Sequence, residues 1–152
     1  MKYLLVFFVL LISISVNADE IRKAIESKDF EQLYKDYHKV LVFDSISADV
    51  KESGLSYVTR KQLFYAMDDH GAGDLHKVTY NYDPLSAWVE IKKAIIYRKD
   101  GTKEALDSTH FYDYPQPARM IYWGARQKMI EAGKLNAGDA LYVELFRKGF
   151  TY

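Results

Sequence analysis

The clearest evidence of the fold is the segment Ala87-Trp88-Val89-Glu90-Ile91-Lys92-Lys93-Ala94-Ile95-Ile96-Tyr97-Arg98-Lys99-Asp100-Gly101-Thr102. Its apolar residues alternate with polar ones, which is typical of a strand with one buried face. The pattern predicts one face made of Ala87, Val89, Ile91, Ile95 and Tyr97 and an opposite face made of Glu90, Lys92 and Arg98. The Asp100-Gly101 pair then predicts a tight hairpin turn, with a return strand over residues 103–109.

Similar patterns on both sides of this hairpin predict further strands at residues 40–50, 55–67, 78–82, 120–130 and 140–146. Turn-forming residues separate them, and residues 68–74 are predicted to be a loop because Asp and Gly dominate them. Residues 112–118 contain Tyr-Pro-Gln-Pro, which we expect to stay out of the sheets because proline has no N–H to donate. There is no glycine-rich βαβ unit and no repeat, so about seven strands predict an all-β fold, an antiparallel β-sandwich.

The first residues have the three parts of a secretory signal peptide. Lys2 provides the positive charge, residues 4–14 form an apolar run, and Val16-Asn17-Ala18 resembles a cleavage site. The run is shorter than the roughly 20 residues that a membrane-spanning helix needs. We therefore expect a signal peptide at residues 1–18, a mature chain that begins at or near Asp19, a helical segment at residues 19–37 and a β-sandwich domain at residues 38–152.

The composition narrows the classes of protein that are compatible with export. Cysteine is absent from the 152 residues, which excludes a lipid-modified cysteine and disulfide bonds. Removal of 18 residues leaves 152 − 18 = 134 residues, enough for one hydrophobic core. Lys2 is the only charge lost, so 20 basic residues face 21 acidic ones. We expect no nucleic-acid partner and no membrane anchor after cleavage, because a nearly neutral chain lacks the charge that draws a protein to either polyanion.

Several short motifs, in a fixed order, resemble a known bacterial domain. They are Tyr80-Asn81-Tyr82-Asp83-Pro84-Leu85, Val89-Glu90-Ile91-Lys92-Lys93-Ala94, Lys99-Asp100-Gly101, Tyr114-Pro115-Gln116-Pro117, Ile121-Tyr122-Trp123, and residues 135–145 with Gly138-Asp139 at a turn. Together they resemble the N-terminal β-sandwich domain of unknown function in exported transglutaminase-like proteins, in versions typical of Bacteroidetes. The similarity extends over residues 36–152.

The resemblance implies a periplasmic or surface-side accessory domain, followed by a papain-like transglutaminase or peptidase domain with a Cys-His-Asp triad. This chain lacks the cysteine nucleophile that such chemistry requires, so no catalytic residue is transferred to it. The family's sandwich normally continues further, and the interpretation is a chain truncated before the catalytic domain. We expect no enzymatic activity and no cofactor from the chain itself.

Three patterns were weighed as sites of chemistry. Asp68, Asp69, His70, Asp74 and His76 could bind zinc or calcium, but they match no recognised ligand spacing and turn geometry accounts for them, so no metal site is predicted. Ser108-Thr109-His110 places hydroxyls beside an imidazole, but neighbours on a strand point to opposite faces. The carboxylates of a glycosidase would come from Glu90, Glu104, Asp107, Glu131 and Glu144, and no pair among them stands out.

The candidate ligand-binding residues are aromatic: Tyr112, Tyr114, Tyr122 and Trp123, with Phe111 beside them. Such side chains bind sugars by stacking and also form protein interfaces, although packing at a corner of the sandwich is the favoured interpretation. Trp88 is predicted to face away from Val89 and Ile91, either exposed or covered by the N-terminal helix.

Two hypotheses about function are favoured over a third, a small hydrolase, for which no nucleophile–base arrangement is visible. The first is a non-catalytic accessory domain that contacts a downstream transglutaminase-like domain or another envelope protein. Its expected signature is an exposed apolar or aromatic patch on one sheet face. The second is a stand-alone module of the cell envelope that binds a glycan or a peptide. In both cases the expected location is the periplasm or the exterior.

Overall fold

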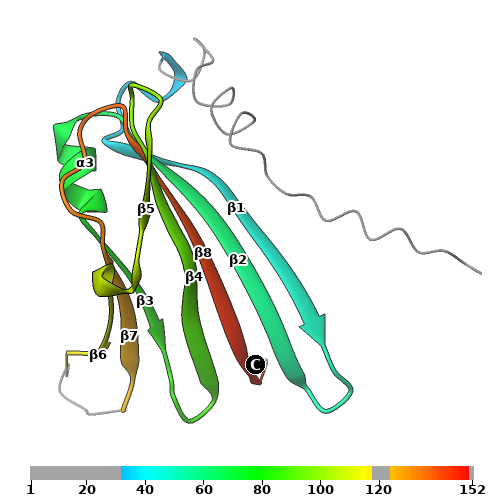
Figure 1. The fold of residues 1–152 in the computed structure, drawn as a ribbon. Coiled ribbons are helices and arrows are strands. Elements are labelled where there is room, and N and C mark those ends of the chain that lie inside the picture. Colours follow the sequence, from blue (N-terminus) through cyan, green and yellow to red (C-terminus); the bar gives the residue numbers. More distant parts are fainter. Residues whose placement is uncertain (1–31, 118–123, 151–152) are drawn as a thin grey trace, which may run out of the picture.

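The computed structural model describes residues 32–117 and 124–150 (Figure 1). In these residues eight strands form two antiparallel sheets, which confirms the predicted all-β class. The five-stranded sheet has the order β1 (Lys39–Val50), β2 (Leu55–Ala66), β8 (Ala140–Phe150), β4 (Ala87–Tyr97), β5 (Lys103–Leu106). The three-stranded sheet has the order β3 (Lys77–Tyr82), β7 (Arg126–Glu131), β6 (Phe111–Pro115). The predicted signal peptide and most of the predicted helix at 19–37 lie outside the described residues.

The core lies between the two sheets. It is made of inward side chains that alternate along the strands, and Leu141, Val143 and Ile130 are fully buried. A short helix, α3 (Asp69–Leu75), adds Ala72 and Leu75 to the same cluster. Burial of a large apolar side chain stabilises the fold by roughly 1.5–3 kcal/mol, so this cluster is the main source of stability in a chain without disulfides.

A β-bulge in β4 changes which residues face the core. The pairing of β4 with β8 shifts between Ile91 and Lys93, so that Ala94 and Ile96 face inward. Ile95 and Tyr97 instead pack against a second apolar cluster on the other face of the sheet. The prediction that Ile95 and Tyr97 share a face with Ile91 is therefore wrong, because one inserted residue reverses the alternation beyond it.

The prediction of a loop at residues 68–74 is also wrong, because helix α3 begins there at Asp69. The Asp68 carboxylate accepts a hydrogen bond of 2.8 Å from the Gly71 amide and caps the helix. Gly71 is needed for close packing, because a Cβ there would lie 1.7 Å from the carbonyl oxygen of His38. The glycine that suggested a turn lets the helix approach the chain that leads into β1.

Strand ends also differ from the predictions. Residues Phe111–Pro115 form edge strand β6, so the expectation that this proline-containing segment stays out of the sheets is wrong. An edge strand that ends at Pro115 tolerates the missing N–H. The return strand β5 is shorter than predicted and is followed by a 3₁₀ turn, η1 (Ser108–His110), whereas β8 continues to Phe150.

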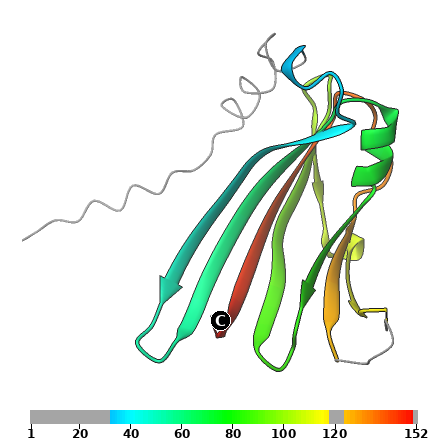
Figure 2. The same cartoon turned by 180° about the vertical axis from the view of Figure 1, so that it is seen from behind.

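The three-stranded sheet covers only part of the larger one. Figures 1 and 2 show β3 beside β4, whereas β1 lies at the far edge of the five-stranded sheet. We call the region of α3 and the start of β8 the closed end, and the inner face of β1 and β2 near the turn at residues 51–54 the open end. No helix in the described parts of the chain is long and apolar enough to span a membrane.

Candidate functional site

The open end exposes apolar side chains on a face that would be buried in a complete sandwich. Ile46 and Val50 of β1 lie on the inner face, because they are paired with Arg60 and Ser56 of β2, whose side chains face inward. Their exposed fractions are 62% and 54%. Adjacent apolar side chains exposed on one sheet face are typical of a surface that contacts another protein segment.

A polar bridge separates this open end from the core. The Arg60 guanidinium forms a bidentate ion pair with Asp44, with 2.8 Å between Nε and Oδ1. The Gln62 amide donates to Asp44 at 3.1 Å, and the Tyr80 hydroxyl of β3 donates to Gln62 Oε1 at 2.9 Å. The bridge therefore links both sheets and satisfies polar groups at the boundary of the core.

The pKa values of this bridge follow from its contacts. The hydrogen bond from Arg60 lowers the pKa of the Asp44 carboxyl, so Asp44 stays ionised. Burial raises the pKa of the Tyr80 hydroxyl, which stays protonated and able to donate. Both effects maintain the hydrogen bonds of the bridge at neutral pH.

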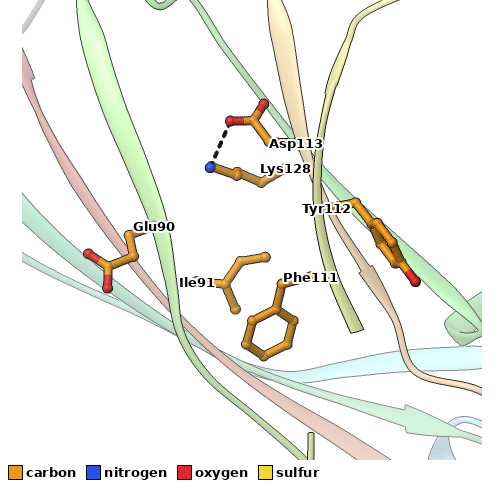
Figure 3. Close-up of a pocket in the computed structure, with 6 residues that line it drawn as sticks. All are labelled: Glu90, Ile91, Phe111, Tyr112, Asp113 and Lys128. Carbon is orange, nitrogen blue, oxygen red and sulfur yellow. Dashed lines mark hydrogen bonds and ion pairs between the residues drawn. The ribbon is translucent and has the colours of Figure 1, made fainter. Parts of the chain in front are cut away.

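A small cleft lies between β4 and the edge formed by β6 and β7 (Figure 3). Its volume is about 170 Å³, and its lining residues are Glu90, Ile91, Phe111, Tyr112, Asp113 and Lys128. In Figure 3 the side chains of Ile91 and Phe111 approach each other from opposite sheets, and the Tyr112 ring lies on the other side of β6. The cleft thus has an apolar floor and a charged rim.

Asp113 is the centre of the charged rim. It accepts hydrogen bonds from Lys128 Nζ at 2.8 Å, from Arg126 Nε at 2.9 Å and from the Tyr82 hydroxyl at 2.8 Å. Burial alone would raise the pKa of the Asp113 carboxyl, but the hydrogen bonds from Lys128, Tyr82 and Arg126 outweigh it and lower the pKa. Burial, with the carboxylate of Asp113 next in effect, raises the pKa of the Tyr82 hydroxyl.

The charged groups of the cleft are engaged in ion pairs. Asp113 is ionised and shared among three donors, and Glu90 pairs with Lys92 at 2.8 Å. No serine or histidine is among the described residues that line the cleft. Of the five candidate carboxylates for glycoside cleavage, only Glu90 lines the cleft, and its carboxylate points to the other side of β4, where it pairs with Lys92 (Figure 3).

The structure brings together two of the four predicted aromatic site residues. Tyr112 and Tyr114 lie on the outer side of β6, with ring centroids 5.6 Å apart and an angle of 11° between the ring planes. Phe111, which was grouped with them, faces inward and packs against the core. Tyr122 and Trp123 lie outside the described residues.

The predicted serine and histidine patterns have structural roles. Ser108-Thr109-His110 is a 3₁₀ turn rather than a strand, so the argument from opposite strand faces is wrong: Thr109 and His110 lie 3.3 Å apart. Asp107 accepts hydrogen bonds from the Thr109 amide and hydroxyl, and Asp107, Thr109 and His110 all belong to this surface turn.

The Asp and His side chains at residues 68–76, which were candidate metal ligands, form ion pairs and hydrogen bonds within the fold. Asp68 contacts His38 at 2.6 Å, and Asp74 pairs with Lys39 at 2.9 Å. His76 contacts the carbonyl oxygen of Gly133 at 2.9 Å. The described residues contain no group of three or more potential metal ligands.

Asp139 is a buried acidic residue that the sequence did not single out. Its side chain is 3% exposed and contacts Arg98 Nη1 at 3.0 Å. Its carboxylate also accepts hydrogen bonds from the amides of Lys99 at 3.0 Å and Asn136 at 2.9 Å. Sequence alone gave no signal beyond an Asp after Gly138 at a turn, because its partners Arg98 and Lys99 come from a separate hairpin.

The family of the chain follows from a comparison with protein families. Residues 52–152 match DUF3857, described as a domain of unknown function with a solved structure. The chain belongs to this family. The matched residues include β2 to β8 and therefore both sheets of the DUF3857 domain. Comparison with curated proteins gave no match.

Two solved structures resemble the domain. One is from Parabacteroides distasonis and is described as a "putative protease"; the TM-score is 0.63 with 13% identity. The similarity covers 76% of this chain but only 24% of the Parabacteroides chain, and at this identity it shows the fold alone. The other, a CBM3a-L domain from the cellulosome scaffoldin CipA of Clostridium thermocellum, has a TM-score of 0.43 and 8% identity, with 75% of this chain and 68% of that chain covered.

Proposed function

We propose that this DUF3857 domain is a non-catalytic accessory domain of an exported transglutaminase-like protein and mediates interdomain or protein–protein contact. The observation that carries the proposal is the open end, where Ile46 and Val50 are exposed on an inner sheet face. A second protein segment that covers this face would remove apolar surface from water, which is worth about 25 cal/mol per Å².

The wider context supports the same function. The fold of the domain recurs as about a quarter of a longer Parabacteroides chain, so this fold also exists joined to further residues. The resemblance of the motifs to exported transglutaminase-like proteins suggests the kind of partner. The cleft supports this function as well, because its charged groups are paired and hold β6, β7 and β3 together.

A site-specific crosslinking experiment tests the contact. A photoreactive amino acid replaces Ile46 on the inner face or, as a matched control, Ser47, which points to the opposite face of the same strand. We expect crosslinks from position 46 in the producing cells, with one envelope protein or domain identified by mass spectrometry. Equal crosslinking from positions 46 and 47, or none from position 46, would contradict the proposal.

Export is part of the proposal and has its own test. We propose cleavage after Ala18 and a periplasmic or secreted mature chain that begins at Asp19, because residues 1–18 have the pattern of a signal peptide. The intact mass of the protein, purified from the envelope fraction, should match residues 19–152. Recovery of the uncleaved chain from the cytoplasm would overturn this part.

A carbohydrate- or peptide-binding module is the second candidate, and one observation favours it. The rings of Tyr112 and Tyr114 are nearly parallel and stacked, and Tyr114 is 44% exposed. An exposed aromatic side chain such as Tyr114 can stack against the apolar face of a sugar. A glycan array should then give signals that the Tyr112→Ala/Tyr114→Ala variant loses, and an array without signals would remove this candidate.

A further inference from the structure

Four aromatic side chains lie together on the outer face of the five-stranded sheet, which is the side away from the three-stranded sheet. We call Tyr57, Trp88, Phe146 and Phe150 the aromatic patch. Phe146 lies at its centre, with centroid distances of 6.4 Å to Tyr57 and 6.0 Å to Trp88. Trp88 and Phe150 are 51% and 53% exposed. The patch is therefore accessible, and it lies on the sheet face opposite the open end.

Lysines surround the aromatic patch. Lys92 Nζ lies 5.4 Å from the centroid of the Phe146 ring, and Lys148 Nζ lies 5.6 Å from that of Tyr57. Lys51 Nζ is 6.0 Å from the Tyr57 ring. Ring faces attract ammonium groups, so the rings hold these lysines over the patch.

Positive charge exceeds negative charge on this part of the face. Asp49 and Glu90 pair with Lys51 and Lys92, but Lys148 is exposed and has no carboxylate within ion-pair distance among the described residues. Next to the patch on the same face, Lys61 of β2 and Lys93 of β4 are the cross-strand neighbours of a single carboxylate, Glu144 of β8. Five lysines thus face three carboxylates, and the surplus favours an anionic ligand.

The ring geometry distinguishes a peptide from a sugar. The planes of Trp88 and Phe146 meet at 70°, so they form no flat platform for stacking. The faces of Phe146 and Tyr57 are occupied by ammonium groups, whereas no lysine lies over Trp88 in the described parts of the chain. Angled rings suit the insertion of an apolar side chain beside Trp88.

We propose that the aromatic patch binds an acidic peptide segment with one apolar anchor. Carboxylates of the peptide pair with Lys148, and with Lys92 beside its existing partner Glu90, and the anchor packs against Trp88 and Phe146. This goes beyond the proposed function, because the surface lies on the opposite face of the sheet from Ile46 and Val50. The two can fail independently: crosslinking at position 46 does not involve the patch.

The test measures peptide binding by the mature chain, residues 19–152. The probe is a fluorescein-labelled peptide of six Asp and Glu residues around a central Leu, titrated by fluorescence anisotropy. The Lys92→Gln/Lys148→Gln variant should weaken binding on the order of tenfold, because two charge pairs are lost. Lys103→Gln is the matched control: Lys103 also lies over an aromatic ring, that of Tyr97 at 5.6 Å, but outside the patch. It should leave the affinity unchanged.

Further measurements test the apolar anchor and distinguish an acidic peptide from other anionic ligands. Replacement of the Leu in the peptide by Ser, or Trp88→Ala in the protein, should each weaken binding several-fold, and binding should weaken with salt. Circular dichroism establishes that each variant is folded. Equal binding of a lysine-based peptide, no effect of the double lysine variant, or no binding at all would overturn the proposal. Binding confined to polygalacturonate or to phosphatidylglycerol vesicles would also overturn it.

Discussion

The closed and open ends of the five-stranded sheet are built from the same kind of strand but treat their inner side chains differently. At the closed end, α3 covers the sheet, and Asp139 ties the start of β8 to the hairpin of β4 and β5. At the open end, Ile46 and Val50 have the same alternating pattern but no cover among the described residues. The difference indicates that one end serves the stability of the domain and the other is available for contact.

The largest expected effect is at Asp139. Asp139→Ala removes the acceptor of Arg98 and of two backbone amides in a buried place, which should reduce the free energy of unfolding by about 3–5 kcal/mol. Asp49→Ala, on the outer face of β1 near the turn at residues 51–54, removes an exposed ion pair with Lys51 and should cost under about 1 kcal/mol. Urea unfolding of both variants measures the contrast, and similar losses would contradict it.

Truncation of apolar side chains compares the two ends directly. Leu141→Ala leaves a cavity in the core and should cost about 2–5 kcal/mol. Ile46→Ala removes a side chain that is 62% exposed and should change stability by no more than about 0.5 kcal/mol. If thermal or urea unfolding shows a comparable loss for Ile46→Ala, then the open end is covered within this chain.

Substitution of two glycines of α3 tests how closely this helix packs at the closed end. Gly71→Ala places a Cβ against the carbonyl oxygen of His38 and should destabilise the domain by roughly 1–3 kcal/mol. Gly73 has no atom within 4 Å of such a Cβ, so Gly73→Ala should stabilise by about 0.5–1 kcal/mol. Melting temperatures that shift in the same direction would show that the contact with His38 is not what requires glycine.

The smallest effect concerns pH and Asp113. Its folded pKa is lower than the ordinary value of 3.8, so its contribution to stability is present above about pH 4 and is lost as the pH falls through the folded pKa. Asp113→Asn should therefore be less stable than the wild type at neutral pH, and the difference should shrink on acidification. If the difference in free energy of unfolding between Asp113→Asn and the wild type stays constant as the pH falls from 7, the lowered pKa of Asp113 is contradicted.

The sequence predicted the parts of the fold that depend on local pattern. Alternation located most of the strands, and Asp100-Gly101 located the hairpin between β4 and β5. It failed at the bulge after Ile91, because periodicity does not reveal an inserted residue. It also failed at α3, where the need for Gly71 comes from His38, far away in sequence.

The candidate site was less predictable than the fold. Tyr112 and Tyr114 were predicted as candidate residues, but their pairing depends on strand β6, which the sequence pattern did not predict in this proline-containing segment. The cleft around Asp113 needs residues from β3, β4, β6 and β7 to meet, and the open end depends on which strands the smaller sheet covers. Both are consequences of tertiary packing that no single segment contains.

The most direct test of the central claim is a crosslinking yield measured at the open end. A photoreactive amino acid replaces Ala48, which lies between Ile46 and Val50 on the inner face, in the wild type and in the Ile46→Ser/Val50→Ser background. We predict that the double variant keeps the wild-type free energy of unfolding within about 0.5 kcal/mol and loses the crosslinked partner. A crosslink that persists at the wild-type yield would contradict the account, and so would a variant that unfolds.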